Sequence, residues 1–257
     1  MVVEVMSMSL RSTTVISSAI VAGLLLLNVG CASLQRKLLY YPSHHDATNG
    51  LTPWLVAGNL IGYAREVPQP KNIWLMIHGN GGQAADRAYA IHNFADDDSI
   101  YLLEYPGYGN RDGTPSMKSF NAAAAEAYLE LRQRYPALPV CVVGESIGSG
   151  ASSHLATLPN PPNKIVLVVP FDKLALVAKE HAPAWLVSLV LRDRWDNVAS
   201  LANYRGPVDI FGAEADDLIP VTHARALAST IPQARITVIA GGHNDWSPGN
   251  QVRIRNE

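Results

Sequence analysis

Residues 140–158, VCVVGESIGSGASSHLATL, form the most informative stretch of the chain. The apolar run VCVV leads directly into Gly144-Glu145-Ser146-Ile147-Gly148, which fits the pattern G-x-S-x-G, and a helix-length segment of small residues follows. A strand, a sharp turn and a helix in this order are typical of a nucleophile elbow, where the strained turn needs glycines beside the serine. We therefore expect Ser146 to be a nucleophile at the end of a buried strand. The alternative is a Gly/Ser turn that only connects a strand to a helix.

Short apolar runs recur on both sides of this stretch and alternate with helix-length segments. We expect strands at 73–77, 100–103, 140–143, 165–169, 208–211 and 236–239. Continuous Val, Ile and Leu runs are typical of strands buried on both faces, and their alternation with helices indicates βαβ units. The sequence thus predicts an α/β fold with a mostly parallel central sheet flanked by helices, over residues 61–257. Residues 172–204 are expected to form a short helical insertion, or cap, before the last two strands.

The composition agrees with one ordinary domain and excludes several classes of protein. Of the 257 residues, 48% are apolar and 16% are charged, so the chain can bury a sizeable core. The chain has 20 basic and 22 acidic residues and no Lys/Arg run, which predicts no nucleic-acid partner. Cys31 and Cys141 lie far apart without a metal-binding spacing, so neither a disulfide framework nor a zinc site is expected. We expect no metal ion and no other cofactor.

A second motif supplies candidate donors for the negative charge that develops when a serine attacks a carbonyl group. An apolar run leads into His78-Gly79-Asn80-Gly81-Gly82, whose glycines let the backbone approach a bound substrate. The predicted oxyanion-hole donors are the backbone N–H groups of Asn80, or alternatively Gly81, and of Ile147. We expect His78 to support this loop rather than to transfer protons. A phosphate-binding loop is disfavoured because the segment has neither a G-K-[ST] nor a GxGxxG pattern.

The histidine and carboxylate that would activate Ser146 are expected after it in the chain. A histidine must take the serine proton, and a carboxylate must orient that histidine. His243 follows the last apolar run in a glycine-rich loop, and Asp216 follows the run before it, four residues ahead of Pro220. This order matches the sequence Ser, Asp/Glu, His that accompanies a nucleophile elbow. We therefore predict that Ser146, Asp216 and His243 form a catalytic triad.

The first thirty residues have the pattern of a targeting segment. No charged residue occurs between Arg11 and Arg36, and the apolar run 15–29 ends beside a glycine and Cys31. This layout is typical of a secretory signal, and it resembles a bacterial lipobox in which Cys31 becomes the lipidated first residue of the mature chain. The motif usually has leucine where this chain has Asn28. The alternative is an uncleaved anchor, since the uncharged run could span about 30 Å of hydrocarbon. In both cases we expect a membrane-tethered protein outside the cytoplasm, at the periplasmic face or cell surface.

Five motifs in the correct order resemble the α/β-hydrolase superfamily, in its serine-hydrolase branch, akin to bacterial esterase-like and serine-aminopeptidase-like members. The matching segments are HGNGG (78–82), EYPGYG (104–109), GESIGSG (144–150), DDLIP (216–220) and GGHND (241–245). In addition, LLYYP at 38–42, within a leading segment of residues 31–60, resembles the start of membrane-tethered members.

The resemblance implies an α/β-hydrolase fold and selects among the candidate acids. In the family motif the acid stands four residues before the proline, which favours Asp216 over Asp217. Some members place their acid after an earlier strand, which makes Asp172 the rival. The chain departs from the family in one respect, because only 14 residues follow His243 where the family has a full terminal helix.

Three functions are compatible with these observations. The first is a serine hydrolase that cleaves an ester, thioester or small amide of a small-molecule acyl substrate through an acyl-enzyme. The second is a non-catalytic, membrane-anchored binding protein on the same fold, which would have no need for all three triad residues. The third is an acyltransferase that uses the triad to pass the acyl group to an alcohol or amine instead of water. Labelling by a fluorophosphonate separates the second from the other two.

Overall fold

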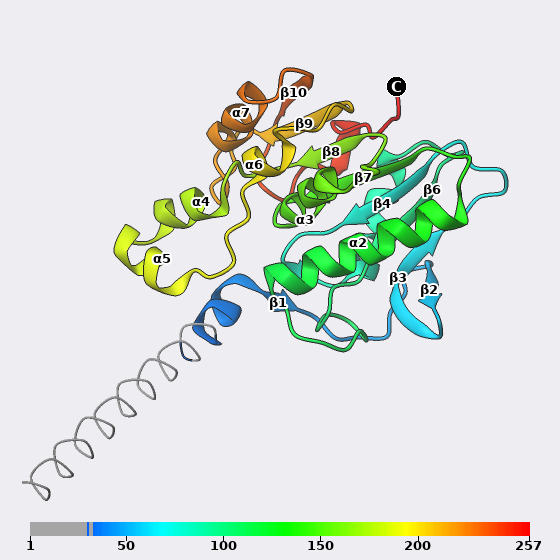
Figure 1. The fold of residues 1–257 in the computed structure, drawn as a ribbon, viewed down its shortest axis with the longest axis horizontal. Coiled ribbons are helices and arrows are strands. Elements are labelled where there is room, and N and C mark those ends of the chain that lie inside the picture. Colours follow the sequence, from blue (N-terminus) through cyan, green and yellow to red (C-terminus); the bar gives the residue numbers. More distant parts are fainter. Residues whose placement is uncertain (1–29, 31–32) are drawn as a thin grey trace, which may run out of the picture.

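The computed structural model describes residue 30 and residues 33–257 (Figure 1). The apolar run 15–29 and Cys31, on which the targeting prediction rests, lie outside these residues. Within the described part of the chain, no helix has the length and hydropathy that crossing a bilayer requires.

An eight-stranded sheet forms the centre of the molecule, in the order β10-β9-β8-β7-β4-β6-β3-β2. Its parallel strands are β4 (Ile73–Ile77), β6 (Ser99–Leu103), β7 (Val140–Glu145), β8 (Ile165–Val168), β9 (Val208–Ala213) and β10 (Ala234–Ile239). These are the strands expected from the apolar runs, so the prediction of a mostly parallel α/β sheet is confirmed. A separate short parallel pair consists of β1 (Tyr41–Pro42) and β5 (Gly81–Gly82).

The sheet continues at one edge in an antiparallel hairpin that the sequence did not indicate to us. Strands β2 (Thr52–Val56) and β3 (Asn59–Arg65) pair with each other, and β3 pairs with β6. Ala57 and Gly58 connect them with positive φ angles of 48° and 82°. Tight hairpin turns of this kind usually carry Asn-Gly or Asp-Gly. An alanine at the first position therefore weakens the sequence signal for the hairpin.

Helices cover both faces of the sheet. The helices α2 (Met117–Arg134), α3 (Gly148–His154) and α7 (Val221–Ser229) pack on one face, together with the short turn η2 (Leu155–Thr157). The 3-10 helix η1 (Ala84–Asn93) packs on the other face. The helix α2 begins after Ser116, whose hydroxyl accepts a hydrogen bond from the N–H of Ser119 and caps the helix.

The expected insertion lies between β8 and β9 and is helical, as predicted. It contains α4 (Leu174–His181), α5 (Ala184–Val190) and α6 (Asn197–Leu201). In Figure 1, α4 and α5 project from the sheet as a lobe on the same side as the helical residues 33–39 near the N-terminus.

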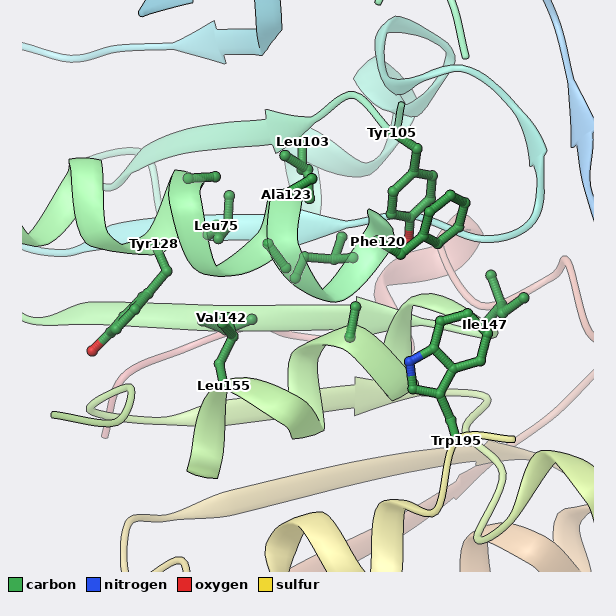
Figure 2. Close-up of a cluster of buried hydrophobic side chains, with 14 of the residues drawn as sticks. Leu75, Leu103, Tyr105, Phe120, Ala123, Tyr128, Val142, Ile147, Leu155 and Trp195 are labelled. Atoms are coloured by element: carbon green, nitrogen blue, oxygen red, sulfur yellow. The ribbon is translucent and has the colours of Figure 1, made fainter. Parts of the chain in front are cut away.

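Side chains alternate along the buried strands and so supply both faces of the sheet with apolar surface. In β4, for example, Leu75 joins the core beneath α2 and α3, whereas Trp74 joins the core beneath η1. Figure 2 shows the first of these cores, where the rings of Tyr105 and Phe120 stack with centroids 3.6 Å apart. Cys141 belongs to the second core, and burial raises the pKa of its thiol to about 12. This cysteine is therefore an apolar packing residue.

The segment after His243 packs on the η1 face of the sheet. The side chains of Trp246, Val252 and Ile254 are fully buried there. Asn93 holds the segment in place, because its carbonyl oxygen accepts from the N–H of Ile254 and its side-chain amide donates to the carbonyl of Val252, both at 2.9 Å. The last described residues, which include the short turn η3 (Pro248–Asn250), thus contribute apolar side chains to this core.

Candidate active site

Ser146 lies in the tight turn between β7 and α3, with φ at 53°. Most non-glycine residues avoid this left-handed region, so the turn is strained at the serine itself. The neighbouring glycines leave the space that the turn needs. A Cβ atom on Gly144 would lie 2.5 Å from the Oγ of Ser152, and one on Gly148 would lie 2.2 Å from the carbonyl oxygen of Ile77. The structure thus gives Ser146 the geometry of a nucleophile elbow.

The structure brings together the three residues that the sequence suggested as a triad. The Nε2 atom of His243 lies 2.9 Å from the Oγ of Ser146, and its Nδ1 atom lies 2.7 Å from Oδ2 of Asp216. The second oxygen of Asp216 accepts hydrogen bonds from the N–H groups of Leu218 and Ile219, at 3.0 and 2.8 Å. Because these bonds orient a fully buried carboxylate toward Nδ1, they favour the tautomer in which Nε2 accepts the serine proton.

The two competing acids lie elsewhere. Oδ1 of Asp172 lies 2.7 Å from Nδ1 of His223, not from His243. Asp217 is exposed to solvent. Among the described residues, only Asp216 has a carboxylate within hydrogen-bond distance of His243.

The loop after β4 places Asn80 beside the serine. The carbonyl oxygen of Asn80 accepts from the N–H of Tyr41 at 3.0 Å and from the hydroxyl of Tyr108 at 2.8 Å, which fixes its peptide group. Asn80 and Ile147 line the same cavity as Ser146. Within the described chain, neither of their backbone N–H groups donates to another protein group, so both can donate to an oxygen atom of a ligand.

His78 supports this loop, which agrees with the role expected for it. Its side chain is buried, and its ring packs against that of Tyr105 with centroids 4.3 Å apart. Nδ1 lies 2.7 Å from the carbonyl oxygen of Gly79, and the hydroxyl of Tyr105 donates to the carbonyl of His78. These contacts hold the start of the Asn80 loop.

A buried ion pair that we had not predicted joins the serine turn to the Asn80 loop. Nε of Arg87 donates to Oε2 of Glu145 at 2.9 Å, and the N–H of Gly79 donates to the same oxygen at 3.1 Å. Burial would raise the pKa of Glu145, but the charge of Arg87 and these hydrogen bonds outweigh it and lower the pKa. Arg87 also donates to the carbonyl of Gly81 at 2.9 Å. The sequence signal for this pair was a charged residue at the first x of G-x-S-x-G, directly after a buried strand.

Breaking this pair should destabilise the protein. We expect Arg87→Met to lower the free energy of unfolding by about 3–5 kcal/mol, because Glu145 would remain buried without its partner. Urea denaturation measures this loss. Arg235→Met is the matched control, since Arg235 is exposed and its partner Asp209 keeps a second ion pair with Lys164 at 2.7 Å. This control should lower the free energy of unfolding by less than about 1 kcal/mol. Equal losses in the two variants would contradict this account of the pair.

An apolar cavity of about 490 Å³ opens beside Ser146. Its walls come mainly from α4, α5 and the helical residues 33–39, and most of its lining side chains are apolar. Leu174 and Val177 line it from α4, and Val187 and Val190 from α5. The cap therefore shapes a cavity that suits an apolar chain attached to the group that reacts at Ser146.

Comparisons with known proteins agree with this fold. No family model matches the chain. An uncharacterised protein of Mycobacterium tuberculosis is 29% identical over 233 residues, which cover 83% of this chain and 82% of the relative. A lysophosphatidylserine lipase of Danio rerio, ABHD12, is 22% identical over 193 residues, which cover 67% of this chain and 50% of the relative. An esterase of Pyrococcus furiosus has the same fold, with a TM-score of 0.60 at 13% identity over 82% of this chain and 91% of the esterase chain.

The sheet order, the serine turn after β7 and the likeness to solved α/β-hydrolases define the class of protein. The chain has the α/β-hydrolase fold, and in sequence it is similar to a putative α/β-hydrolase and to lysophosphatidylserine lipases. The lipases and esterases among the similar proteins support a hydrolase.

Proposed function

We propose that the protein is a carboxylesterase-type serine hydrolase, tethered to a membrane by its N-terminal segment, which cleaves acyl esters through an acyl-enzyme. The observation that carries this proposal is the continuous hydrogen-bonded series from Asp216 through His243 to Ser146, which lines an apolar cavity. The cleaved bond would be an ester, a thioester or a small amide.

The proposed reaction has two halves. Oγ of Ser146 attacks the substrate carbonyl carbon while Nε2 of His243 takes the hydroxyl proton, and Asp216 stabilises the resulting imidazolium. The N–H groups of Asn80 and Ile147 donate to the oxyanion. When the tetrahedral intermediate collapses, His243 gives its proton to the leaving oxygen, sulfur or nitrogen. A water molecule then attacks the acyl-enzyme with His243 again as the base, which releases the acid and restores Ser146.

A series of p-nitrophenyl esters of increasing acyl length tests this function. Because the cavity beside Ser146 is almost wholly apolar, we expect kcat/KM to rise from the acetyl ester to esters of longer chains. Release of p-nitrophenol, followed by its absorbance, measures each rate. No hydrolysis of any ester, or a preference for acetyl over every longer chain, would contradict the proposal.

The tether can be tested separately from the chemistry. We expect the wild-type protein, produced in a bacterial host, to incorporate labelled palmitate at Cys31 and to fractionate with membranes, since several acyl chains hold a protein firmly to a bilayer. Cys31→Ala should lose the label. Equal labelling of the Cys31→Ala protein would show that the lipobox interpretation is wrong, and membrane retention without any label would favour an uncleaved anchor.

A further inference from the structure

Large apolar side chains are exposed on two helices that border the cavity. On α5, Trp185 is 69% and Leu189 is 52% exposed. On the helical residues 33–39, Leu34 is 44% and Leu38 is 61% exposed. Each pair is spaced by four residues, so its members lie on one face of their helix. We refer to these four residues as the cap face.

Buried polar contacts fix the N-terminal helix to the segment that follows α5. Nε2 of Gln35 donates to Oδ2 of Asp193 at 2.6 Å, and Oε1 of Gln35 accepts from the N–H of Asp193 at 2.8 Å. The hydroxyl of Tyr40 donates to the same Asp193 carboxylate at 2.5 Å. Gln35 and Asp193 are both buried. The N-terminal helix therefore packs on the end of the cap as a fixed element, and Figure 1 shows the two at the same side of the molecule.

The position and charge of the cap face indicate what covers it. The apolar run 15–29 ends five residues before Leu34, so the chain reaches the cap face directly from the segment proposed as the membrane tether. Residues 182–191, which include α5, contain no charged residue, while Arg36 and Lys37 lie between the two exposed leucines. Helices with exposed Trp and Leu beside basic residues are typical of segments that lie in a lipid–water interface.

We propose that the cap face lies in the surface of the lipid layer to which the protein is tethered, and that the cavity takes its acyl substrate directly from that layer. Leu34 and Leu38 belong both to the cap face and to the cavity lining, so the cavity borders this surface. The substrate class is then a single-chain acyl lipid, whose chain passes from the layer into the cavity while its ester reaches Ser146. This second part rests on the proposed function, whereas the placement of the cap face does not.

Trp185 gives a direct measurement of this placement. The other four tryptophans, Trp54, Trp74, Trp195 and Trp246, are buried. We would reconstitute the full chain into phosphatidylcholine and phosphatidylglycerol vesicles, with and without brominated acyl chains, which quench nearby tryptophan fluorescence. We expect brominated lipid to quench the tryptophan emission of the wild type. The Trp185→Phe variant should show much less quenching.

A matched variant carries its exposed tryptophan elsewhere on the molecule. Leu129 on α2 is 55% exposed and lies outside the cap. The double variant Trp185→Phe with Leu129→Trp should show as little quenching as Trp185→Phe alone. Absence of quenching in the wild type, or equal quenching in the wild type and Trp185→Phe, would overturn the placement of the cap face. The placement would also be overturned if the full chain formed a dimer in detergent and Trp185→Ser abolished that dimer, because a second copy would then cover the cap face.

Kinetics test the route of the substrate. The double variant Trp185→Ser with Leu189→Ser should lose about tenfold in the hydrolysis of monoacylglycerol within vesicles. It should hydrolyse soluble p-nitrophenyl butyrate as the wild type does, because neither side chain lines the cavity. Leu129→Ser should change neither rate. Equal losses on both substrates would overturn substrate uptake from the layer. If the wild type hydrolyses neither substrate, the proposed function and this uptake both fail, while fluorescence quenching still decides the placement of the cap face.

Discussion

Replacement of Ser146 by alanine should abolish ester hydrolysis while the protein stays folded. The variant loses the oxygen that lies 2.9 Å from Nε2 of His243 and would attack the substrate, so no acyl-enzyme can form. Removing the nucleophile of such a triad lowers kcat by about 10⁶-fold, and what remains comes from the oxyanion donors and from binding. Initial rates with the best p-nitrophenyl ester measure this loss.

The fold should survive this substitution because alanine is smaller than serine and adds no atom to the crowded turn. We expect the free energy of unfolding to change by less than about 1 kcal/mol, measured by urea denaturation. A folded Ser146→Ala protein whose rate stays within about tenfold of the wild type would contradict the acyl-enzyme mechanism.

The second large effect is expected from Asp216→Asn. The side-chain oxygen of the new asparagine can keep the hydrogen bonds from Leu218 and Ile219, which turns its NH₂ group toward Nδ1 of His243. Nδ1 must then accept a hydrogen bond, so the proton moves to Nε2, and Nε2 can no longer take the proton of Ser146. Loss of the correct tautomer lowers kcat by up to about 10⁴-fold with little change in KM.

The neighbouring acids are the matched controls for this prediction. Asp172 contacts His223, and Asp217 is exposed, so Asp172→Asn and Asp217→Asn should leave kcat within a small factor of the wild type. Initial-rate kinetics on one soluble ester rank the three variants. A larger loss at Asp172 or Asp217 than at Asp216 would show that the acid is assigned to the wrong residue.

Most of the sheet was predictable from sequence because five of its six parallel strands, all but the edge strand β10, are almost wholly buried on both faces. Such strands read as continuous apolar runs, and each of the six parallel strands has one. Ser146, Asp216 and His243 could be placed because each follows one of these runs, and the carboxyl ends of parallel strands meet at one edge of the sheet. Local sequence was therefore sufficient for the parallel strands and for the order of the candidate residues, but not for the hairpin of β2 and β3.

Contacts between distant residues could not be predicted in this way. The pairing of Arg87 with Glu145 depends on the crossing of two segments 58 residues apart. Gln35 and Asp193 are 158 residues apart, and neither residue type marks a buried contact. Nothing in their local patterns specifies a partner, since polar side chains of these kinds are usually exposed. The cavity could not be predicted for the same reason, because its walls combine the cap with residues near the N-terminus.

Fluorophosphonate labelling tests whether Ser146 is an activated nucleophile. Phosphonylation needs the serine oxygen together with the base that removes its proton, so it reports the chemistry without knowledge of the substrate. We expect mass spectrometry to find one adduct on the folded wild-type protein, on the peptide that contains Ser146, and none on Ser146→Ala. A folded wild-type protein that takes no label, or that carries the label on another serine, would contradict the proposal that this site is a serine hydrolase.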